Sequence, residues 1–266
     1  MSFSISGKTA VVTGAANGVG LAIARHFVDK GANVMFADMD EDRLIEELGE
    51  EESDNIAWFA GDLREKLSTA NLLSATIDRF DRVDILVNAT RQMASSDPLN
   101  ADDDLVTELL NQNLITSLRL TQVFAKRMIK QAAKGDGDGP AGSIINLSSI
   151  AARRTHPDLL AYSVSCAALD QMTRSMAVAL AEHGIRVNAI ALGSVMSASL
   201  KTTIQEHSEV RDEILDCTPL HRIASPAELA EVAQFLASDG SGFMTGQILT
   251  VDGGRTLVDV TDTAAH

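Results

Sequence analysis

The chain has 266 residues and a formal net charge of −15, which argues against nucleic acid or an anionic membrane surface as a partner, because both need a basic footprint. No uncharged apolar run reaches the length of a membrane span, and the N-terminus lacks the pattern of a secretory signal. Two cysteines, Cys166 and Cys217, give no disulfide framework, and the six histidines lack metal-site spacing. We therefore expect a cytoplasmic protein without a bound metal.

The first structured segment is a glycine-rich turn. Residues 13–20, Thr-Gly-Ala-Ala-Asn-Gly-Val-Gly, follow an apolar, β-branched run (8–12) and precede a run with apolar residues at helical spacing (21–28). Strand, turn and helix in this order predict the opening of a dinucleotide-binding unit, with a pyrophosphate at the helix N-terminus. The turn supplies five candidate cofactor contacts: Gly14, Asn17, Gly18, Val19 and Gly20.

A second apolar run, 32–37, is expected to be a strand, and it ends at Asp38. An acidic residue there can accept hydrogen bonds from the ribose 2′-hydroxyl of a dinucleotide and would repel a 2′-phosphate. No basic residue in 15–17 or at Met39 is available to bind that phosphate. The sequence therefore predicts NAD(H) rather than NADP(H) as the cofactor.

Strand-like runs alternate with helical stretches to near the end of the chain. The remaining expected elements are an acidic helix (41–52), a strand (56–60), a helix (68–80), a strand (83–87), a long helical region (103–131), a mobile loop (132–142), a strand (143–147), a helix (160–182), a strand (186–191), a helix (226–237) and a strand (247–251). This alternation predicts a single α/β domain over 1–266, a doubly wound parallel sheet with helices on both faces. Ligands then bind at the carboxyl ends of the strands, where six residues fall: Gly14, Asp38, Asp62, Asn88, Ser149 and Gly193.

Several motifs occur together in this sequence and extend over nearly the whole chain. They are Thr13 to Gly20, Asp62-Leu63, Asn113, Ser149, Tyr162 thirteen residues after it, Thr245-Gly246-Gln247, and Val251-Asp252-Gly253-Gly254. With them the chain resembles the short-chain dehydrogenase/reductase family. The resemblance implies a Rossmann-type fold, a nicotinamide cofactor, a small-molecule carbonyl or alcohol substrate, and a homotetramer.

The resemblance also assigns roles. Ser149 would hydrogen-bond the substrate oxygen, Tyr162 would exchange a proton with it, and Asn113 would hold a proton-relay water. This division is chemically reasonable, because a hydride transfer at carbon needs a matching proton transfer at oxygen. Asp62 and Leu63 would border the adenine. The contacts expected at the nicotinamide end are Asn88, Ala89, Tyr162, Gly193 and Val195.

The chain departs from the family pattern at Cys166, where the family has a lysine four residues after the tyrosine. Positions four apart on a helix are neighbours, so that ammonium lowers the pKa of the tyrosine and holds the nicotinamide ribose. A thiol supplies no such charge, and Cys166 is best interpreted as a small buried hydrophobic residue. Alcohol oxidation should suffer most from its presence, because oxidation needs the phenolate of Tyr162 as a base.

Two further departures lie near the same end of the cofactor: Arg91 replaces a family glycine, and Leu192 replaces a family proline. Arg91, Arg153, Arg154 and His156 follow strands in an otherwise acidic chain. They are either a solvated rim, a site for an anionic substrate, or the source of an arginine that replaces the missing cation beside Tyr162.

Two functions therefore stay open: an NAD(H)-dependent oxidoreductase, and a catalytically silent NAD(H)-binding homologue that serves as a sensor, scaffold or oligomer subunit. The segment 194–218, with a helix expected over 208–217, is where the family varies its substrate lid. It contains nothing diagnostic of the substrate.

Overall fold

The computed structural model of the chain describes residues 3–49, 53–134 and 140–259. Within them, seven strands form one parallel sheet in the order β3-β2-β1-β4-β5-β6-β7. The strands are β1 (Thr9–Thr13), β2 (Asn33–Asp38), β3 (Ile56–Ala60), β4 (Ile85–Asn88), β5 (Gly142–Ser149), β6 (Ile185–Leu192) and β7 (Ile248–Val251). The doubly wound parallel sheet expected from the sequence is confirmed, with each predicted strand within two residues of its place.

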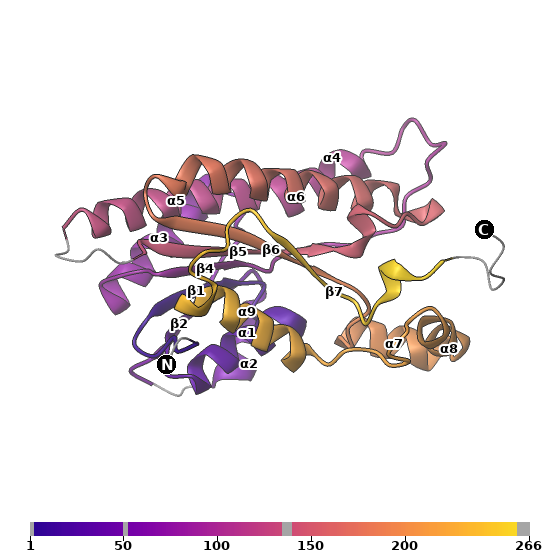
Figure 1. The fold of residues 1–266 in the computed structure, drawn as a ribbon, viewed down its shortest axis with the longest axis horizontal. Coiled ribbons are helices and arrows are strands. Elements are labelled where there is room, and N and C mark those ends of the chain that lie inside the picture. Colours follow the sequence, from indigo (N-terminus) through magenta and orange to yellow (C-terminus); the bar gives the residue numbers. More distant parts are fainter. Residues whose placement is uncertain (1–2, 50–52, 135–139, 260–266) are drawn as a thin grey trace.

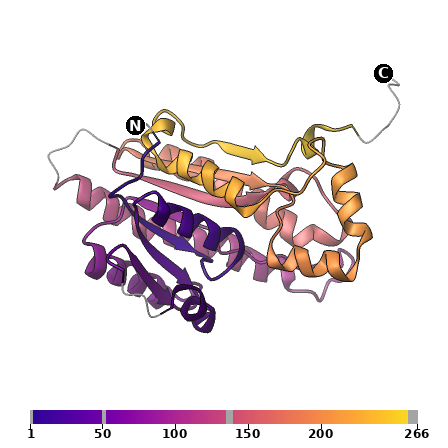
Figure 2. The same cartoon turned by 90° about the horizontal axis from the view of Figure 1, so that it is seen from below.

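Helices cover both faces of the sheet (Figures 1 and 2). One face carries α1 (Gly18–Asp29), α2 (Glu41–Leu48) and α9 (Pro226–Ala237), and the other carries α3 (Lys66–Phe80), α5 (Thr116–Ala132) and α6 (Leu160–Ala181). Each face has its own apolar core, with Phe27 and Phe36 fully buried in the first and Phe124 in the second. Because both faces are covered, the central strands are buried along their whole length and read in the sequence as continuous apolar runs.

The long helical region expected over 103–131 is divided in the structure. It consists of α4 (Leu105–Leu109), a π-helical turn η1 (Leu110–Ile115) and α5. A π-turn inserts extra backbone into a helix. Here the Thr116 hydroxyl donates to the carbonyl of Asn111 at 2.9 Å, and the Ser117 hydroxyl donates to that of Asn113 at 3.0 Å. Residues 50–52 of the expected acidic helix and 135–139 of the expected loop lie outside the described residues.

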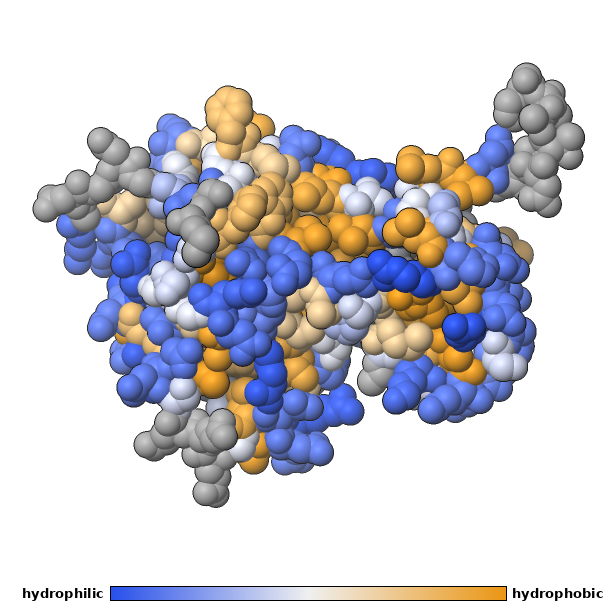
Figure 3. All heavy atoms as spheres, turned by 60° about the horizontal axis from the view of Figure 1, so that its bottom comes forward, coloured by the Kyte–Doolittle hydropathy of each residue, from blue (hydrophilic) through white to orange (hydrophobic). Residues whose placement is uncertain are grey.

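The segment 194–218 contains two helices, α7 (Ala198–Glu206) and α8 (Glu209–Asp216). The second agrees with the helix expected over 208–217, and the first was not predicted. In Figure 3, α7 and α8 form a lobe, and an indentation separates this lobe from the body that carries α1 and α2. This lobe lies at the end of the sheet to which the strands run (Figure 1).

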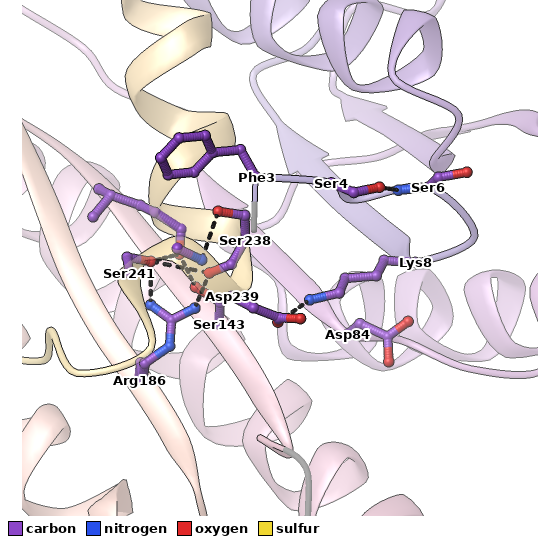
Figure 4. Close-up of polar contacts among 12 residues, drawn as sticks. Phe3, Ser4, Ser6, Lys8, Asp84, Ser143, Arg186, Ser238, Asp239 and Ser241 are labelled. Atoms are coloured by element: carbon purple, nitrogen blue, oxygen red, sulfur yellow. Dashed lines mark hydrogen bonds and ion pairs between the residues drawn. The ribbon is translucent and has the colours of Figure 1, made fainter. Parts of the chain in front are cut away.

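The opposite end of the sheet holds a buried guanidinium. Arg186, only 7% exposed in β6, donates from Nη1 to the Ser241 hydroxyl at 2.8 Å and from Nη2 to the carbonyl of Ser238 at 3.1 Å. Burial lowers the pKa of Arg186, and the nearby charge of Asp239 opposes this. Figure 4 shows Lys8 paired with Asp239 beside the same cluster. Arg186 thus ties the turn after α9 to the sheet.

We expect Arg186→Ala to lower the free energy of unfolding by about 2 to 4 kcal/mol, because it removes two buried hydrogen bonds of a charged donor and the packing of its side chain. Lys8→Ala is the control: its partly exposed ion pair should contribute less than about 1 kcal/mol. Urea unfolding followed by circular dichroism measures both. Equal small losses in the two variants would contradict the role given to Arg186.

Candidate active site

The glycine-rich turn has the shape that a bound pyrophosphate needs. Gly14 and Gly18 have φ of +64° and +58°, in the left-handed region that glycine tolerates best. A Cβ on Gly20 would lie 2.0 Å from the carbonyl oxygen of Gly14, whereas one on Gly18 would meet no atom within 4 Å. The Asn17 side chain makes no capping hydrogen bond to α1. The N-terminus of α1, with Val19 in its first turn, therefore faces open space with its backbone N–H groups available to an anion.

Asp38 lies beside this turn, at the end of β2. One of its carboxylate oxygens accepts from the N–H of Ala16 at 3.0 Å, and the other accepts from the N–H groups of Met39 and Asp40 at 2.8 and 3.2 Å. The half-buried carboxylate is therefore fixed over the turn at the place where the sequence expected it.

Asp62 and Leu63 follow β3 at the same edge of the sheet. Leu63 is 5% exposed. The carboxylate of Asp62 forms a two-pronged pair with Arg64, from Nε at 2.9 and 3.0 Å and from Nη2 at 2.6 Å. This hydrogen bonding with Arg64 holds the pKa of Asp62 below its usual value. Asp62 is therefore ionised at neutral pH and already has a cationic partner.

The segment after β4 is held against the turn by a residue that the sequence reasoning did not single out as a site residue. The hydroxyl of Thr13 accepts from the N–H groups of Ala89 and Thr90 at 3.1 and 3.2 Å. A Cβ on Gly14 would approach the Thr90 nitrogen to 2.9 Å, so glycine is required for this close approach. Asn88 donates to Asn146 at 2.8 Å inside the sheet.

Tyr162 and Arg91 meet at the centre of the site. Tyr162 is in the first turn of α6 and only 3% exposed. Its hydroxyl oxygen accepts a hydrogen bond of 2.9 Å from Nη1 of Arg91, which follows β4. Burial raises the pKa of Tyr162, while the charge of Arg91 and the hydroxyl of Ser149 lower it. The structure thus places a guanidinium on Tyr162, with Ser149 at the end of β5 beside it.

Cys166 lies one turn beyond Tyr162 on α6 and is 3% exposed. Burial raises the pKa of its thiol, and hydrogen bonding to Tyr162 and the charge of Arg91 only partly oppose this. The thiol is therefore neutral at physiological pH. It packs with Leu109, Ala151 and Ala161 in a small apolar cluster, in agreement with the interpretation of Cys166 as a buried hydrophobic residue.

Asn113, in the π-turn, is joined to the segment that carries Arg91. Its Oδ1 accepts from the N–H of Gln92 at 2.8 Å, and its Nδ2 donates to the carbonyl of Gln92 at 2.9 Å and to the Ser165 hydroxyl at 3.0 Å. Ser165 in turn donates to the carbonyl of Tyr162 at 2.8 Å. Asn113 therefore connects the residue after Arg91 to the helix that carries Tyr162.

Gly193 and Val195 follow β6 at the carboxyl end of the sheet. The N–H of Gly193 donates to the carbonyl of Val251 at 3.0 Å, and a Cβ on Gly193 would lie 2.9 Å from Cα of Asp252. Val195 is 6% exposed and forms a β-bridge with Ala224. The closing motif after β7 therefore lies directly against the start of the segment 194–218.

The other basic residues singled out in the sequence each have a different hydrogen-bond partner. Arg153 donates to the Thr250 hydroxyl at 3.3 Å, and Arg154 donates to the carbonyl of Thr256. His156 accepts from the N–H of Asp158 at 3.3 Å in its own turn. Of the set, Arg91 reaches Tyr162.

The chain is similar to known proteins over nearly its whole length. The family profile described as enoyl-(acyl carrier protein) reductase matches residues 14–256. L-fucose dehydrogenase of Mus musculus is 34% identical over 258 residues, with 95% of this chain and 89% of the mouse protein covered.

Two solved structures share the fold over nearly the whole chain. A 7α-hydroxysteroid dehydrogenase complexed with NADH and 7-oxo glycochenodeoxycholic acid has a TM-score of 0.85 and 30% identity, with coverage of 95% of this chain and 96% of its own. A gluconate 5-dehydrogenase from Burkholderia cenocepacia J2315 in complex with NADP and tartrate has a TM-score of 0.85 and 28% identity, with coverage of 97% and 98%.

Neither a candidate membrane span nor a candidate metal cluster is found among residues 3–49, 53–134 and 140–259. Among these residues, no helix combines the length and apolar character of a membrane span. Nor do three or more histidine, cysteine or acidic side chains gather there as a metal site would require.

Proposed function

This chain belongs to the short-chain dehydrogenase/reductase family of oxidoreductases, and from that premise we propose that it is an NAD(H)-dependent enzyme that interconverts a secondary alcohol and a carbonyl. Tyr162 is the acid/base, and Ser149 polarises the substrate oxygen. The observation that carries the proposal is the buried Tyr162 hydroxyl beside Ser149, with the guanidinium of Arg91 2.9 Å away.

The residues present fit a nicotinamide dinucleotide. The open N-terminus of α1 receives the pyrophosphate and Asp38 the adenosine ribose, while Asp62 and Leu63 border the adenine. When bound, the oxidised cofactor accepts a hydride from the alcohol carbon. The cofactor-binding set comprises Gly14, Asn17, Gly18, Val19, Gly20, Asp38, Asp62, Leu63, Asn88, Ala89, Tyr162, Gly193 and Val195.

The protein supplies the proton transfer. In oxidation the phenolate oxygen of Tyr162 takes the proton of the substrate hydroxyl, which the Ser149 hydroxyl orients by a hydrogen bond. In reduction the neutral phenol returns a proton to the developing alkoxide. Arg91 stabilises the phenolate by its charge and its hydrogen bond, the function that the family gives to the lysine at the position of Cys166.

Asn113 is proposed as a positioning residue. Its three hydrogen bonds fix Gln92 relative to Ser165 of α6, and this holds the preceding residue, Arg91, within reach of Tyr162. The proton-relay water that the resemblance assigns to Asn113 stays a prediction.

The alternative function, a silent NAD(H)-binding homologue, followed from the lack of a cation at Cys166. The contact of Arg91 with Tyr162 favours the enzyme, because the segment after β4 supplies the cation that α6 lacks at Cys166. Activity that arises only in Cys166→Lys, with none in the natural chain, would support the silent homologue instead.

The first test is a titration with NADH and, separately, with NADPH, followed by nucleotide fluorescence. We expect NADH to bind more tightly, since the carboxylate of Asp38 repels a 2′-phosphate. A screen of secondary alcohols and ketones with the preferred cofactor then follows. If neither nucleotide binds, the proposed function fails.

Asp38 gives a sharper prediction for the choice of cofactor. Asp38→Asn, which keeps the size and an acceptor oxygen but removes the charge, should narrow the preference for NADH over NADPH by about tenfold or more, the effect of roughly 1.4 kcal/mol of lost repulsion. Asp40→Asn is the control. Asp40 is the N-cap residue of α2, two residues after Asp38, and its replacement should leave the ratio of NADH to NADPH affinity unchanged. An unaltered ratio in Asp38→Asn would refute the assignment.

We further propose a homotetramer in the reducing cytoplasm. Hydrophobic residues gather on the upper part of the surface in Figure 3, as expected where a partner chain covers the surface. Phe243 and Leu257 are 106% and 86% exposed in the single chain. Sedimentation at a mass four times the 28.3 kDa of one chain supports the proposal.

A further inference from the structure

Three neighbouring segments leave the sheet side by side after β5, β6 and β7. Ser149 pairs in register with Leu192, and Leu192 pairs with Val251, so the residues that follow these three lie at one edge of the sheet. Figure 1 shows the turn after β7, η5 (Arg255–Leu257), at this end of the sheet, above α7 and α8. We call this edge, where the residues that follow β5, β6 and β7 lie next to Ser149, the mouth of the proposed site.

Two arginines connect these segments without meeting a carboxylate. Arg154, which follows β5, donates from Nη2 to the carbonyl of Thr256, and Arg255 donates from Nη1 to the Ser194 hydroxyl at 3.0 Å. Among residues 3–49, 53–134 and 140–259, neither guanidinium forms an ion pair. Neither guanidinium therefore has a carboxylate in direct contact among these residues.

The acidic residue nearest in sequence to Arg255 does not neutralise it. The carboxylate of Asp252 accepts from the N–H groups of Gly254 at 3.0 Å and Thr256 at 2.7 Å. Burial acts to raise the pKa of Asp252, but these backbone hydrogen bonds hold it below its usual value. Asp252 is thus ionised and occupied in its own turn. Arg154 and Arg255 thus bring two positive charges to the same edge of the sheet in a chain of net charge −15 with 37 acidic residues.

We propose that the substrate carries an anionic oxygen group, a carboxylate or a phosphate ester, bound by Arg154 and Arg255. This inference rests on the proposed function, since it names the substrate class of the same site. Each guanidinium has five N–H donors and gives one in the bonds described, so donors are left for a planar or tetrahedral oxyanion. Ser149 lies five residues before Arg154, and Ser194 directly follows Gly193. The anionic group is therefore held at the mouth while the reacting carbon lies at Ser149 and Tyr162.

The test uses sets of compounds that share a carbon skeleton and differ in one end group. Glucitol, gluconate and glucitol 6-phosphate form one set: neutral, carboxylate and phosphate. Equivalent sets on a pentitol and on a short secondary alcohol widen the range. The natural enzyme should show a kcat/KM at least about tenfold higher for an anionic member than for its neutral partner, as expected for a charge-assisted hydrogen bond. The preferred anion distinguishes a carboxylate from a phosphate.

Variants identify the residues. Arg255→Gln and Arg154→Gln should raise KM for the anionic member about 10- to 100-fold with little change in kcat, and leave the neutral member unchanged. Arg255→Lys should restore part of the loss. Arg174→Gln, an arginine well along α6 from the mouth, is the matched control. If Arg154 and Arg255 only tie segments together, both members of each set should lose equally and the thermal unfolding midpoint should fall.

A binding measurement separates this inference from the proposed function. If NADH binds but no compound in the panel is turned over, the proposed reaction fails, and the anion site is then tested by gluconate and glucitol 6-phosphate titrated into the protein–NADH complex. Binding that weakens in Arg255→Gln and with added salt supports the anion site. Preference for neutral compounds, or anion binding that is absent or indifferent to Arg154 and Arg255, overturns it.

Discussion

Tyr162→Phe is expected to lower the rate of alcohol oxidation about 10³-fold, within the range for loss of a general acid/base. The substrate proton then has no acceptor, because the hydroxyl that faces Arg91 and Ser149 is gone. The ring stays buried in the same cluster, so the fold should persist and NADH affinity should fall far less than the rate. Initial rates at saturating NAD⁺ and the fluorescence titration measure the two effects.

Ser149→Ala is the companion variant and should cost less, since it removes orientation and one hydrogen bond but leaves the acid/base. If Tyr162→Phe keeps more than a tenth of the activity, Tyr162 is not the acid/base. Equal loss of rate and of NADH affinity would point instead to damage of the cofactor site.

The pH dependence of the two directions follows from the same hydroxyl. Burial raises the pKa of Tyr162 against the opposing charge of Arg91. Oxidation needs the ionised form, so its rate should climb with pH through neutrality. Reduction needs the protonated form, so its rate should be level over the same range. Rates from about pH 6 to about pH 10, the span around a tyrosine pKa, check this, and a flat oxidation profile would argue against it.

The strands and the cofactor turn could be predicted because local sequence determines them. Parallel strands covered on both faces are apolar runs, as in β1, Thr-Ala-Val-Val-Thr. The glycines at 14, 18 and 20 identify the turn because its backbone leaves no choice of residue. The conformation of the turn proposed to bind the adenosine half of the cofactor could therefore be predicted from the sequence.

The nicotinamide half depends on contacts between distant segments. The guanidinium of Arg91 could point to solvent or to Tyr162 on sequence grounds alone, and its direction is decided by Thr13 and Asn113, which fix the segment around it. The π-turn that holds Asn113 was also not predicted, because the spacing of apolar residues in 110–115 resembles that of an α-helix. Helix α7 was missed since the threonines at 202 and 203 weaken the helical pattern.

Arg91→Gln is expected to lower alcohol oxidation at neutral pH about 10- to 100-fold, the value of a charge-assisted hydrogen bond of roughly 1.5 to 3 kcal/mol. Glutamine is two bonds shorter than arginine and uncharged, so it removes both the charge and the hydrogen bond that Nη1 of Arg91 gives to the Tyr162 hydroxyl. Because Arg91 lowers the pKa of Tyr162, its removal raises that pKa further, and the oxidation profile should move to higher pH. Carbonyl reduction, which starts from the neutral phenol, should lose less.

Cys166→Lys in the Arg91→Gln background tests whether the two positions supply the same charge. Cys166 lies four residues after Tyr162 on α6, so an ammonium there reaches the same hydroxyl. We expect the double variant to recover oxidation and to move the pH profile back, whereas Cys166→Lys alone should gain little because Arg91 is already present. Arg174→Gln, which removes an equal charge from α6, should change neither profile. If the two substitutions simply add, Arg91 does not replace the lysine, because two cations that serve one hydroxyl must show strong coupling in a double-mutant cycle.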